Sequence, residues 1–258
     1  MKRITVFIIS LLAVASLLNA QDAASIMDAA KNRIKKDTLS TRSRMEIRAK
    51  NGSTTERRID QYSKDDVKGN ERMVVVFQSP ANVAGTRFLT IDNTDGSSDR
   101  WIYLPSLKKV RRIAASEGGG SFMGTDFSYD DMSALNRDVD LDTYTILREE
   151  TLNGAPCYVI QSVPKDSSYQ YSKTISWVDK DKSLIYRSEM HDRRGTLVKI
   201  METSDFRDVQ DRLTPMQTKV STQAAGTSTI IYSEIVKYDD PIPESVFTTA
   251  YLETGRTR

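Results

Sequence analysis

The most regular feature of the sequence is an alternation of polar and apolar residues that begins near residue 41. Ser43, Met45 and Ile47 alternate with charged residues, and this period of two is typical of a β-strand with one buried and one charged face. Asn51-Gly52 then predicts a turn, and residues 54–64 predict the returning strand of a hairpin. The first two strands of the chain are therefore expected to form an antiparallel pair.

The same pattern recurs along most of the remaining chain. Further strands are expected over residues 72–78, 87–91, 100–104, 108–113, 142–150, 157–163, 173–179, 183–190, 196–203, 214–222 and 228–238. Turn signals separate them and no strand–helix–strand alternation occurs, which favours an antiparallel sheet. A sheet of so many strands must curl, split or close. The expected fold class is mainly β (α+β), with about eleven strands and thirteen at most.

Two segments interrupt the strand pattern and could cover the apolar face of the sheet. Residues 22–36 predict a helix with one apolar stripe, capped by Asp22. Residues 117–132 have no period: three glycines, Gly118 to Gly120, precede four large apolar side chains. Consecutive glycines favour a mobile segment, and apolar side chains on a loop must lie over something apolar. The loop is either a hinged lid or a permanent plug, and we favour the lid, with Phe122, Met123, Phe127 and Tyr129 as its apolar residues.

Residues 1–20 predict a cleaved secretory signal peptide. Lys2 and Arg3 form a positive start, an apolar stretch follows, and cleavage is expected near Ala20. No cysteine lies near this site to carry a lipid anchor. The expectation is one exported domain over residues 21–258, located in the periplasm.

Charge and cysteine content remove several classes of function. Residues 1–20 hold two of the 37 basic residues and none of the 35 acidic ones, so the remaining chain is balanced and nucleic-acid binding is not expected. Cys157 is the only cysteine, which excludes an intrachain disulfide and a thiol-based metal site.

The sequence offers little catalytic chemistry. His191 is the sole histidine, and its neighbour Asp192 would point to the opposite face of a strand, so a surface turn residue is the better interpretation. We therefore expect no enzyme, no cofactor and no metal. Asp126, Asp130 and Asp131 could hold calcium, but their spacing matches no EF-hand, and capping of a short helix around residues 128–135 is favoured.

A basic cluster follows the first part of the sheet. Lys108, Lys109, Arg111 and Arg112 could meet acidic lipid head groups or a partner, although such a run is usually a solvated strand face.

Apolar binding is the remaining function that the residues support. Methionine and aromatic side chains are deformable or broad and suit acyl chains, although each could equally pack a core. The candidate lining of an apolar cavity consists of Met45, Ile47, Met73, Val75, Phe77, Trp101, Tyr103 and Trp177.

Several runs of residues resemble the outer-membrane lipoprotein-sorting proteins related to the LolA carrier. The most specific are 101–105 (WIYLP), 109–113 (KVRRI) and 122–132 (FMGTDFSYDDM), and residues 177–179, 187–189, 192–195 and 242–247 add weaker matches. The resemblance spans nearly the whole exported chain. It implies a LolA-like, strongly curved antiparallel half-barrel, covered by an N-terminal helix and a loop or short-helix lid.

The resemblance also implies a function. Such a protein would be a periplasmic carrier that binds the acyl chains of lipoproteins or lipids and moves them towards the outer membrane, between an inner-membrane transporter and an outer-membrane acceptor. In the carrier an arginine on a strand latches the lid through backbone contacts, and Arg44 is the candidate here. The alternative is a non-carrier accessory subunit of an RND/MMPL-type envelope transporter.

Overall fold

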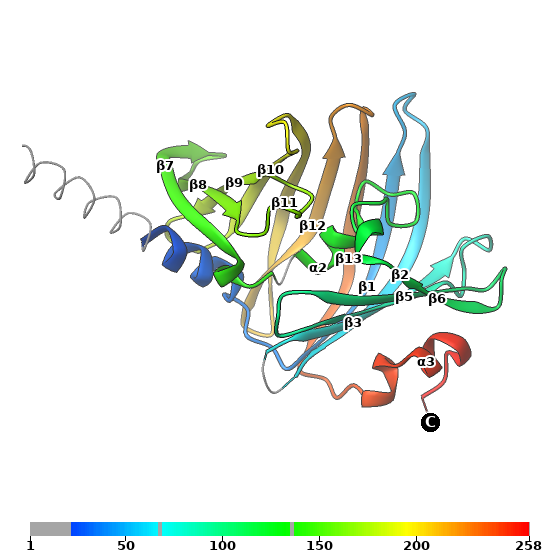
Figure 1. The fold of residues 1–258 in the computed structure, drawn as a ribbon. Coiled ribbons are helices and arrows are strands. Elements are labelled where there is room, and N and C mark those ends of the chain that lie inside the picture. Colours follow the sequence, from blue (N-terminus) through cyan, green and yellow to red (C-terminus); the bar gives the residue numbers. More distant parts are fainter. Residues whose placement is uncertain (1–21, 67–68, 135–136, 258) are drawn as a thin grey trace, which may run out of the picture. The chain divides into compact units, whose positions relative to one another are not determined.

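The computed structural model describes residues 22–66, 69–134 and 137–257, so the signal peptide expected over residues 1–20 lies outside the described residues. The fold is mainly β, as the alternating sequence pattern predicts (Figure 1). One antiparallel sheet contains 13 strands in the order β6-β5-β4-β3-β2-β1-β13-β12-β11-β10-β9-β8-β7. The expectation of about eleven strands was therefore slightly low.

Each strand expected from the sequence is present. The bounds are β1 (Thr38–Arg48), β2 (Thr54–Asp65), β3 (Glu71–Ser79), β4 (Arg87–Asp92), β5 (Ser98–Leu104), β6 (Lys109–Ile113), β7 (Asp142–Leu152), β8 (Ala155–Pro164), β9 (Lys173–Asp179), β10 (Ile185–His191), β11 (Leu197–Val209), β12 (Arg212–Thr222) and β13 (Thr227–Tyr238). Strands that follow one another in sequence are neighbours in the sheet, except that β13 pairs with β1 and that β6 and β7 form its two ends.

The helices are few and short. Residues 22–31 are helical, a shorter stretch than the expected 22–36. Two further helices are α2 (Tyr129–Ala134) and α3 (Thr249–Thr254), and there are 3₁₀ turns η1 (Ala115–Glu117), η2 (Val139–Leu141) and η3 (Glu244–Phe247). None of the helices in the described residues is both long and apolar enough to span a membrane.

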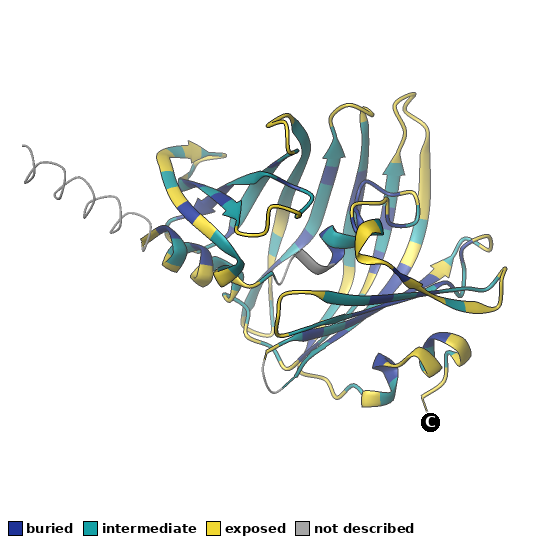
Figure 2. Cartoon of the chain, in the orientation of Figure 1, coloured by how far each residue is buried: buried dark blue, intermediate teal, exposed yellow. Residues whose placement is uncertain are grey.

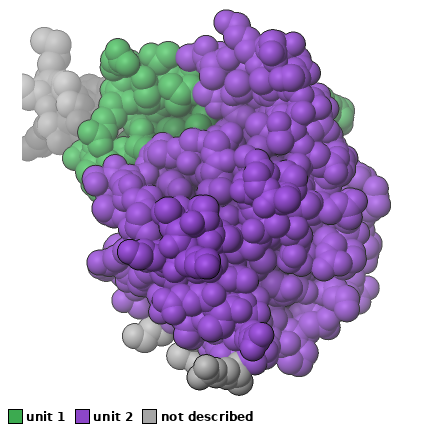
Figure 3. All heavy atoms as spheres, turned by 90° about the vertical axis from the view of Figure 1, so that its right-hand side faces the viewer, with its two compact units in different colours: residues 1–33, 138–200 green, residues 34–137, 201–258 purple. Residues whose placement is uncertain are grey.

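The chain forms two compact units, coloured separately in Figure 3. Unit 1 comprises residues 1–33 and 138–200, and unit 2 comprises residues 34–137 and 201–258. In unit 1, the helix over residues 22–31 packs Ala23 and Met27 against Tyr144, Ile160 and Val178 of strands β7 to β9. The N-terminal helix therefore covers the sheet of its own unit.

Unit 2 packs apolar residues on both faces of strands β3 to β6. Consecutive residues of β3 alternate between two clusters, because successive side chains of a strand point to opposite faces. Val75 and Phe77 face one cluster, whereas Val74 and Val76 face the other. Figure 1 shows α2 on one side of these strands and α3 on the other, and Figure 2 shows the buried residues along them. Each face thus has its own cover.

Candidate functional site

The candidate site lies where residues 117–132, here called the covering loop, pack on the sheet of unit 2. The loop follows β6 and ends within α2. A single isolated bridge, between Ser121 and Ser128, is its only strand-like pairing recorded among the described residues. The loop is therefore attached by side chains rather than by a ladder of backbone hydrogen bonds.

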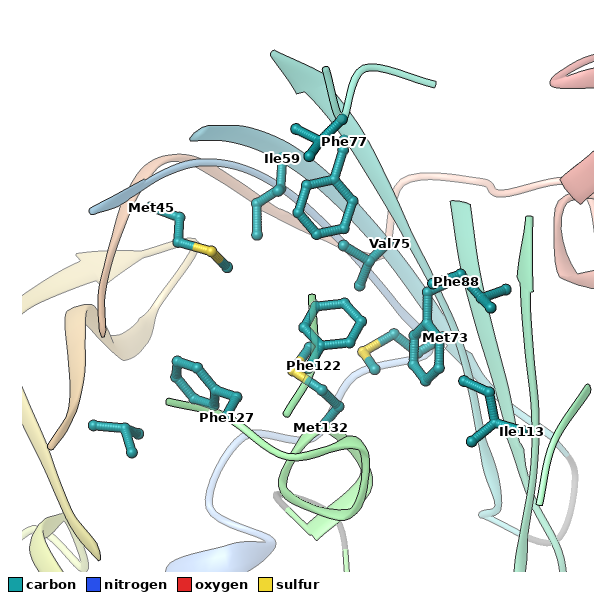
Figure 4. Packing of buried hydrophobic residues seen from close by; sticks show 13 residues of the cluster. Met45, Ile59, Met73, Val75, Phe77, Phe88, Ile113, Phe122, Phe127 and Met132 are labelled. Carbon is teal, nitrogen blue, oxygen red and sulfur yellow. The ribbon is translucent and has the colours of Figure 1, made fainter. Parts of the chain in front are cut away.

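The apolar side chains of the loop point into the sheet. Phe122 is 0% exposed, and Phe127 and Met132 are also buried. Figure 4 shows these three side chains directed at a ring of sheet residues: Met45, Ile59, Met73, Val75, Phe77, Phe88 and Ile113. The Phe122 ring lies 5.1 Å from that of Phe88 in an edge-on arrangement, and 5.8 Å from that of Phe77. The loop thus fills the apolar face itself.

Methionine is frequent in this cluster. Met45, Met73 and Met132 are buried in it, and Met123 and Met201 pack against it. Unbranched thioether side chains change shape at low cost, so they can repack around different apolar partners. The cluster can therefore repack at low cost.

Arg57 on β2 provides the first polar attachment of the loop. Its Nη1 donates a hydrogen bond of 2.7 Å to the backbone oxygen of Met123. Arg57 pairs directly with Met45 across the strands, so its side chain lies on the loop side of the sheet. Burial lowers the pKa of Arg57, and no ion pair to it is recorded among the described residues. The recorded polar partner of the Arg57 guanidinium among the described residues is therefore the backbone carbonyl of the loop.

Asp126 provides the second attachment. Its buried carboxylate accepts hydrogen bonds from the hydroxyl groups of Thr222 (2.6 Å), Thr229 (2.8 Å) and Thr227. Its backbone N–H donates to Thr229 Oγ1 at 2.9 Å. These threonines lie on β12 and β13, so Asp126 ties the middle of the loop to the β12–β13 hairpin.

Asp130 provides the third attachment and explains the first glycine of the loop. It forms a largely buried ion pair of 2.8 Å with Arg100 on β5. Burial raises the pKa of the Asp130 carboxyl, while Arg100 opposes that shift. A Cβ atom at Gly118 would lie 2.2 Å from Asp130 Oδ1, so only glycine fits there. Gly118 thus has a packing role in addition to the flexibility expected from the sequence.

The acidic residues of the loop each have a separate task. Asp131 Oδ2 accepts from the Ser128 backbone N–H at 2.7 Å, and the Asp131 N–H donates to Ser128 Oγ at 3.0 Å. This reciprocal pair caps the start of α2, as the sequence predicts. Asp126, Asp130 and Asp131 therefore point to threonines, an arginine and a helix start, and do not converge on one point.

The structure brings together most of the residues expected to line an apolar cavity. Met45, Met73, Val75 and Phe77 lie in the cluster under the covering loop, and Ile47 packs against it. All four apolar residues expected for the lid are there too: Phe122, Met123, Phe127 and Tyr129.

Three of the expected lining residues lie elsewhere. Trp101 and Tyr103 pack in the cluster on the other side of β5, against the C-terminal segment that contains Val246 and Phe247. Trp177 packs with Cys157 and Val159 in unit 1. The prediction that Trp101 and Tyr103 lie on the same face as Phe77 is therefore wrong. Ile102 and Leu104 face the covering loop, and adjacent residues of a strand point to opposite faces, so Trp101 and Tyr103 face away from the loop.

Arg44 also differs from its expected position. Its guanidinium lies over the Tyr232 ring, 4.1 Å from the centroid, and pairs with Glu46 at 3.3 Å. It neighbours Met45 in β1 and therefore points to the opposite face. Arg57 is the arginine that contacts the loop backbone, which the sequence analysis missed. Arg57 lies two residues before Ile59 in the second strand, so both side chains lie on the same face. That spacing is the sequence signal that could have identified Arg57.

Comparisons with known proteins agree with this architecture. The model of a family described as "Uncharacterized protein" matches residues 69–254. No curated protein matches the chain.

Three solved structures are similar over nearly the whole chain. A DUF1329 family protein from Desulfovibrio piger is 29% identical with a TM-score of 0.86, covering 91% of this chain and 99% of its own. A protein from Vibrio parahaemolyticus, described as an outer membrane lipoprotein-sorting protein domain, is 26% identical with a TM-score of 0.85, covering 91% and 100%. A LolA superfamily protein from Nitrosomonas europaea, 21% identical with a TM-score of 0.72 and coverage of 89% and 98%, shares the fold.

Proposed function

We propose that this protein is a non-catalytic carrier of acyl chains. The chain belongs to the family whose model matches residues 69–254, and its fold is similar to that of the outer membrane lipoprotein-sorting protein domain from Vibrio parahaemolyticus. The acyl site is the apolar face of strands β1 to β5 that the covering loop now fills. The cargo is the acyl part of a lipoprotein or of a lipid.

The observation that carries this proposal is the way in which the loop is held. Its side chains Phe122 and Phe127 are buried as deeply as core residues, yet the loop is outside the sheet. It is attached through Arg57, Asp126 and Asp130, at the positions described above. Polar contacts of this kind can exchange with water when the loop moves, whereas strand pairing cannot be lost without unfolding part of the sheet.

The proposal gives the loop a defined part in binding. In the closed form Phe122 and Phe127 occupy the apolar face, and an acyl chain displaces them when the loop swings away. Burial of an acyl chain contributes about 0.8 kcal/mol per methylene, so a chain of ordinary length offsets the loss of the loop contacts. The methionines of the cluster adapt to the new occupant.

A reversible lock on the loop tests this proposal. Asp126→Cys and Thr229→Cys place two thiols where the Asp126 carboxylate and the Thr229 hydroxyl now meet at 2.8 Å. The native Cys157 is buried and belongs to unit 1, so it does not compete. Uptake of a fluorescent fatty acid is then measured with the engineered pair oxidised and reduced, beside the unaltered protein.

We expect the unaltered and reduced proteins to take up the fatty acid and the oxidised one to take up little. An unaltered protein that binds no fatty acid, and that carries no lipid when purified, would overturn the carrier function. Equal uptake in the oxidised and reduced forms would instead place the acyl site away from the covering loop.

The location and partners of the carrier follow from the same proposal. We infer that it works in the periplasm after cleavage near Ala20, receives cargo from an inner-membrane transporter and delivers it to an outer-membrane acceptor. Crosslinking in cells tests this: transient capture of lipidated cargo supports a carrier, whereas one permanent membrane partner without cargo supports an accessory subunit of a transporter.

A further inference from the structure

The turn between β5 and β6 exposes an apolar side chain beside two exposed lysines. Leu107 is 63% exposed, more than the other large apolar residues identified as exposed in the described parts of the chain, Leu147 and Ile235. Lys108 and Lys109 follow it and are also exposed, as Figure 2 shows for this turn. No ion pair of either lysine is recorded among the described residues.

The charge of the basic cluster is concentrated at this turn. Arg111 is paired with Glu117 at 2.7 Å, and Arg112 is paired with Asp99. These two arginines are therefore largely neutralised by neighbours. Lys108 and Lys109 remain available to a partner. Of the four cations in the cluster, these two are the ones without a carboxylate partner recorded among the described residues.

Backbone groups, rather than the side chains of Leu107 and Lys108, close the turn. Hydrogen bonds run from the Leu107 N–H to the Leu104 oxygen (3.0 Å) and from the Lys108 N–H to the Pro105 oxygen (3.3 Å). Lys108 has a φ of 50°, a left-handed conformation that glycine or asparagine adopts at lower cost. Lysines can protect the edge of a sheet from pairing, but an exposed leucine does not serve that purpose.

We propose that this turn docks the protein on an anionic phospholipid bilayer. Leu107 enters the region between head groups and acyl chains, while Lys108 and Lys109 bind lipid phosphates. A leucine flanked by cations complements an interface that is apolar below and negatively charged above. With one apolar residue and two charges, the docking is reversible and depends on salt.

The position of the turn adds a consequence for the covering loop. Pro105 Cγ would lie 3.3 Å from a Cβ at Gly85, so the turn adjoins the segment between β3 and β4. Val83 of that segment is buried in the cluster under the loop, and Leu104 packs against the same cluster. Docking through Leu107 would therefore bring the bilayer close to the rim of the proposed acyl site. The docking surface itself does not depend on that site.

Vesicle binding tests the docking surface. The full exported chain is sedimented with vesicles of phosphatidylglycerol and phosphatidylethanolamine, and with vesicles of phosphatidylcholine alone. We expect binding to the anionic vesicles that falls at least tenfold in Leu107→Asp and in the double variant Lys108→Glu/Lys109→Glu. Leu147→Asp, which changes an exposed leucine of unit 1, is the matched control and should bind as the unaltered chain does.

A fluorophore at the tip separates insertion from simple attraction. Because Cys157 is 0% exposed, Leu107→Cys can be labelled selectively with an environment-sensitive dye. A blue shift with anionic vesicles supports insertion, and no shift overturns it. The proposal would be overturned if the unaltered chain bound neutral and anionic vesicles equally, or if the turn variants bound as the unaltered chain does. Binding only to an acidic protein would also overturn it and would assign the turn to a protein partner. Fatty-acid uptake, measured on the same variants, reports the proposed carrier function separately.

Discussion

At the scale of single residues, Arg57 is one of three polar contacts that hold the covering loop on the sheet. Its guanidinium is half-buried, has no recorded carboxylate partner in the described residues, and donates to the Met123 carbonyl. A hydrogen bond from a charged donor typically contributes about 1.5–3 kcal/mol. Most of that free energy belongs to the closed form of the loop, because an open loop offers no such acceptor.

Replacing Arg57 should therefore open the loop without unfolding the sheet. In Arg57→Gln we expect exchange of the Phe122 and Thr125 backbone amides, which are hydrogen-bonded within the loop, to be about tenfold faster or more. Arg44→Gln is the matched control, since it removes an arginine that faces away over Tyr232. Hydrogen-exchange mass spectrometry makes the measurement. Equal acceleration in both variants would show that Arg57 does not hold the loop.

Asp92 gives a prediction about pH. Burial raises the pKa of its carboxyl from 3.8 to about 6, against the hydrogen bond from Ser98, and the acids Glu71 and Asp65 raise it further while Arg100 lowers it. The folded protein thus binds this proton more tightly than the unfolded chain. The resulting stabilisation is complete below about pH 4 and is lost as pH rises through about 6.

Asp92→Asn should accordingly raise the melting temperature at pH 8, by several degrees, and change it little at pH 4, because asparagine stays neutral at both values. Asp95→Asn is a control of opposite sign: a hydrogen bond from Ser97 lowers the pKa of Asp95, so its neutralisation should give no gain at pH 8. Thermal unfolding of the three proteins at both pH values decides. A gain for Asp92→Asn that is equal at pH 4 and pH 8 would contradict the assignment.

At the scale of elements, the proposed carrier function requires that the covering loop and an acyl chain compete for one apolar surface. An acyl chain must displace the Phe122 ring from its contacts with Phe77, Phe88 and Tyr129. Phe122→Ala removes that ring and leaves apolar space, which can hold an apolar molecule. We expect the variant to bind a fluorescent fatty acid about tenfold more tightly, although its folded state loses about 3–5 kcal/mol.

Phe247→Ala is the matched control for this prediction. Phe247 is also a buried phenylalanine of unit 2, but it lies in the cluster on the opposite face of the sheet. Its truncation should lower the melting temperature to a similar extent and leave the affinity unchanged. If affinity falls together with stability in Phe122→Ala, the loop is a permanent part of the core.

The elements themselves were largely predictable from the sequence. Period-two alternation located strands with one charged face, such as β1, and short apolar runs between turn signals located strands such as β4 and β5. The capped start of α2 was visible from Ser128 and Asp131. The face of the sheet on which each apolar residue lies was harder to predict. Trp101, Tyr103 and Phe77 were expected on one surface, but the sheet has two apolar faces, and an apolar residue in a strand does not itself indicate which face it covers.

Long-range polar partners could not be derived from the sequence in the same way. The contact between Arg57 and Met123 joins residues 66 positions apart, and that between Asp126 and Thr229 joins residues 103 apart. Their pairing depends on how the loop is folded over the sheet, whereas strand alternation is a local property. A pattern of spacing therefore indicates an inward arginine but not its acceptor.

At the scale of the molecule, unit 2 has two surfaces to cover, because both faces of strands β3 to β6 carry apolar residues. The face opposite the covering loop is closed by the C-terminal segment, where Val246, Phe247 and Leu252 are buried against Val76 and Leu89. Glu244 anchors this segment through ion pairs of 2.5 Å with Lys64 and Arg72. Without it, an extended apolar surface would meet water, and such surfaces bind other proteins or aggregate.

Truncation before residue 241 should therefore change the association state of the protein more than its strand content. We expect increased binding of a hydrophobic dye and concentration-dependent self-association, measured by fluorescence and analytical ultracentrifugation, with a melting temperature lowered by the loss of three buried side chains. Removal of residues 256–258 alone, which follow α3, should have neither effect. A truncated chain that does not self-associate and binds no more dye would mean that other residues already cover this face and that the C-terminal segment is not needed to cover it. Self-association confined to the longer truncation would mean that the segment keeps the second apolar face of unit 2 out of contact with other copies of the chain.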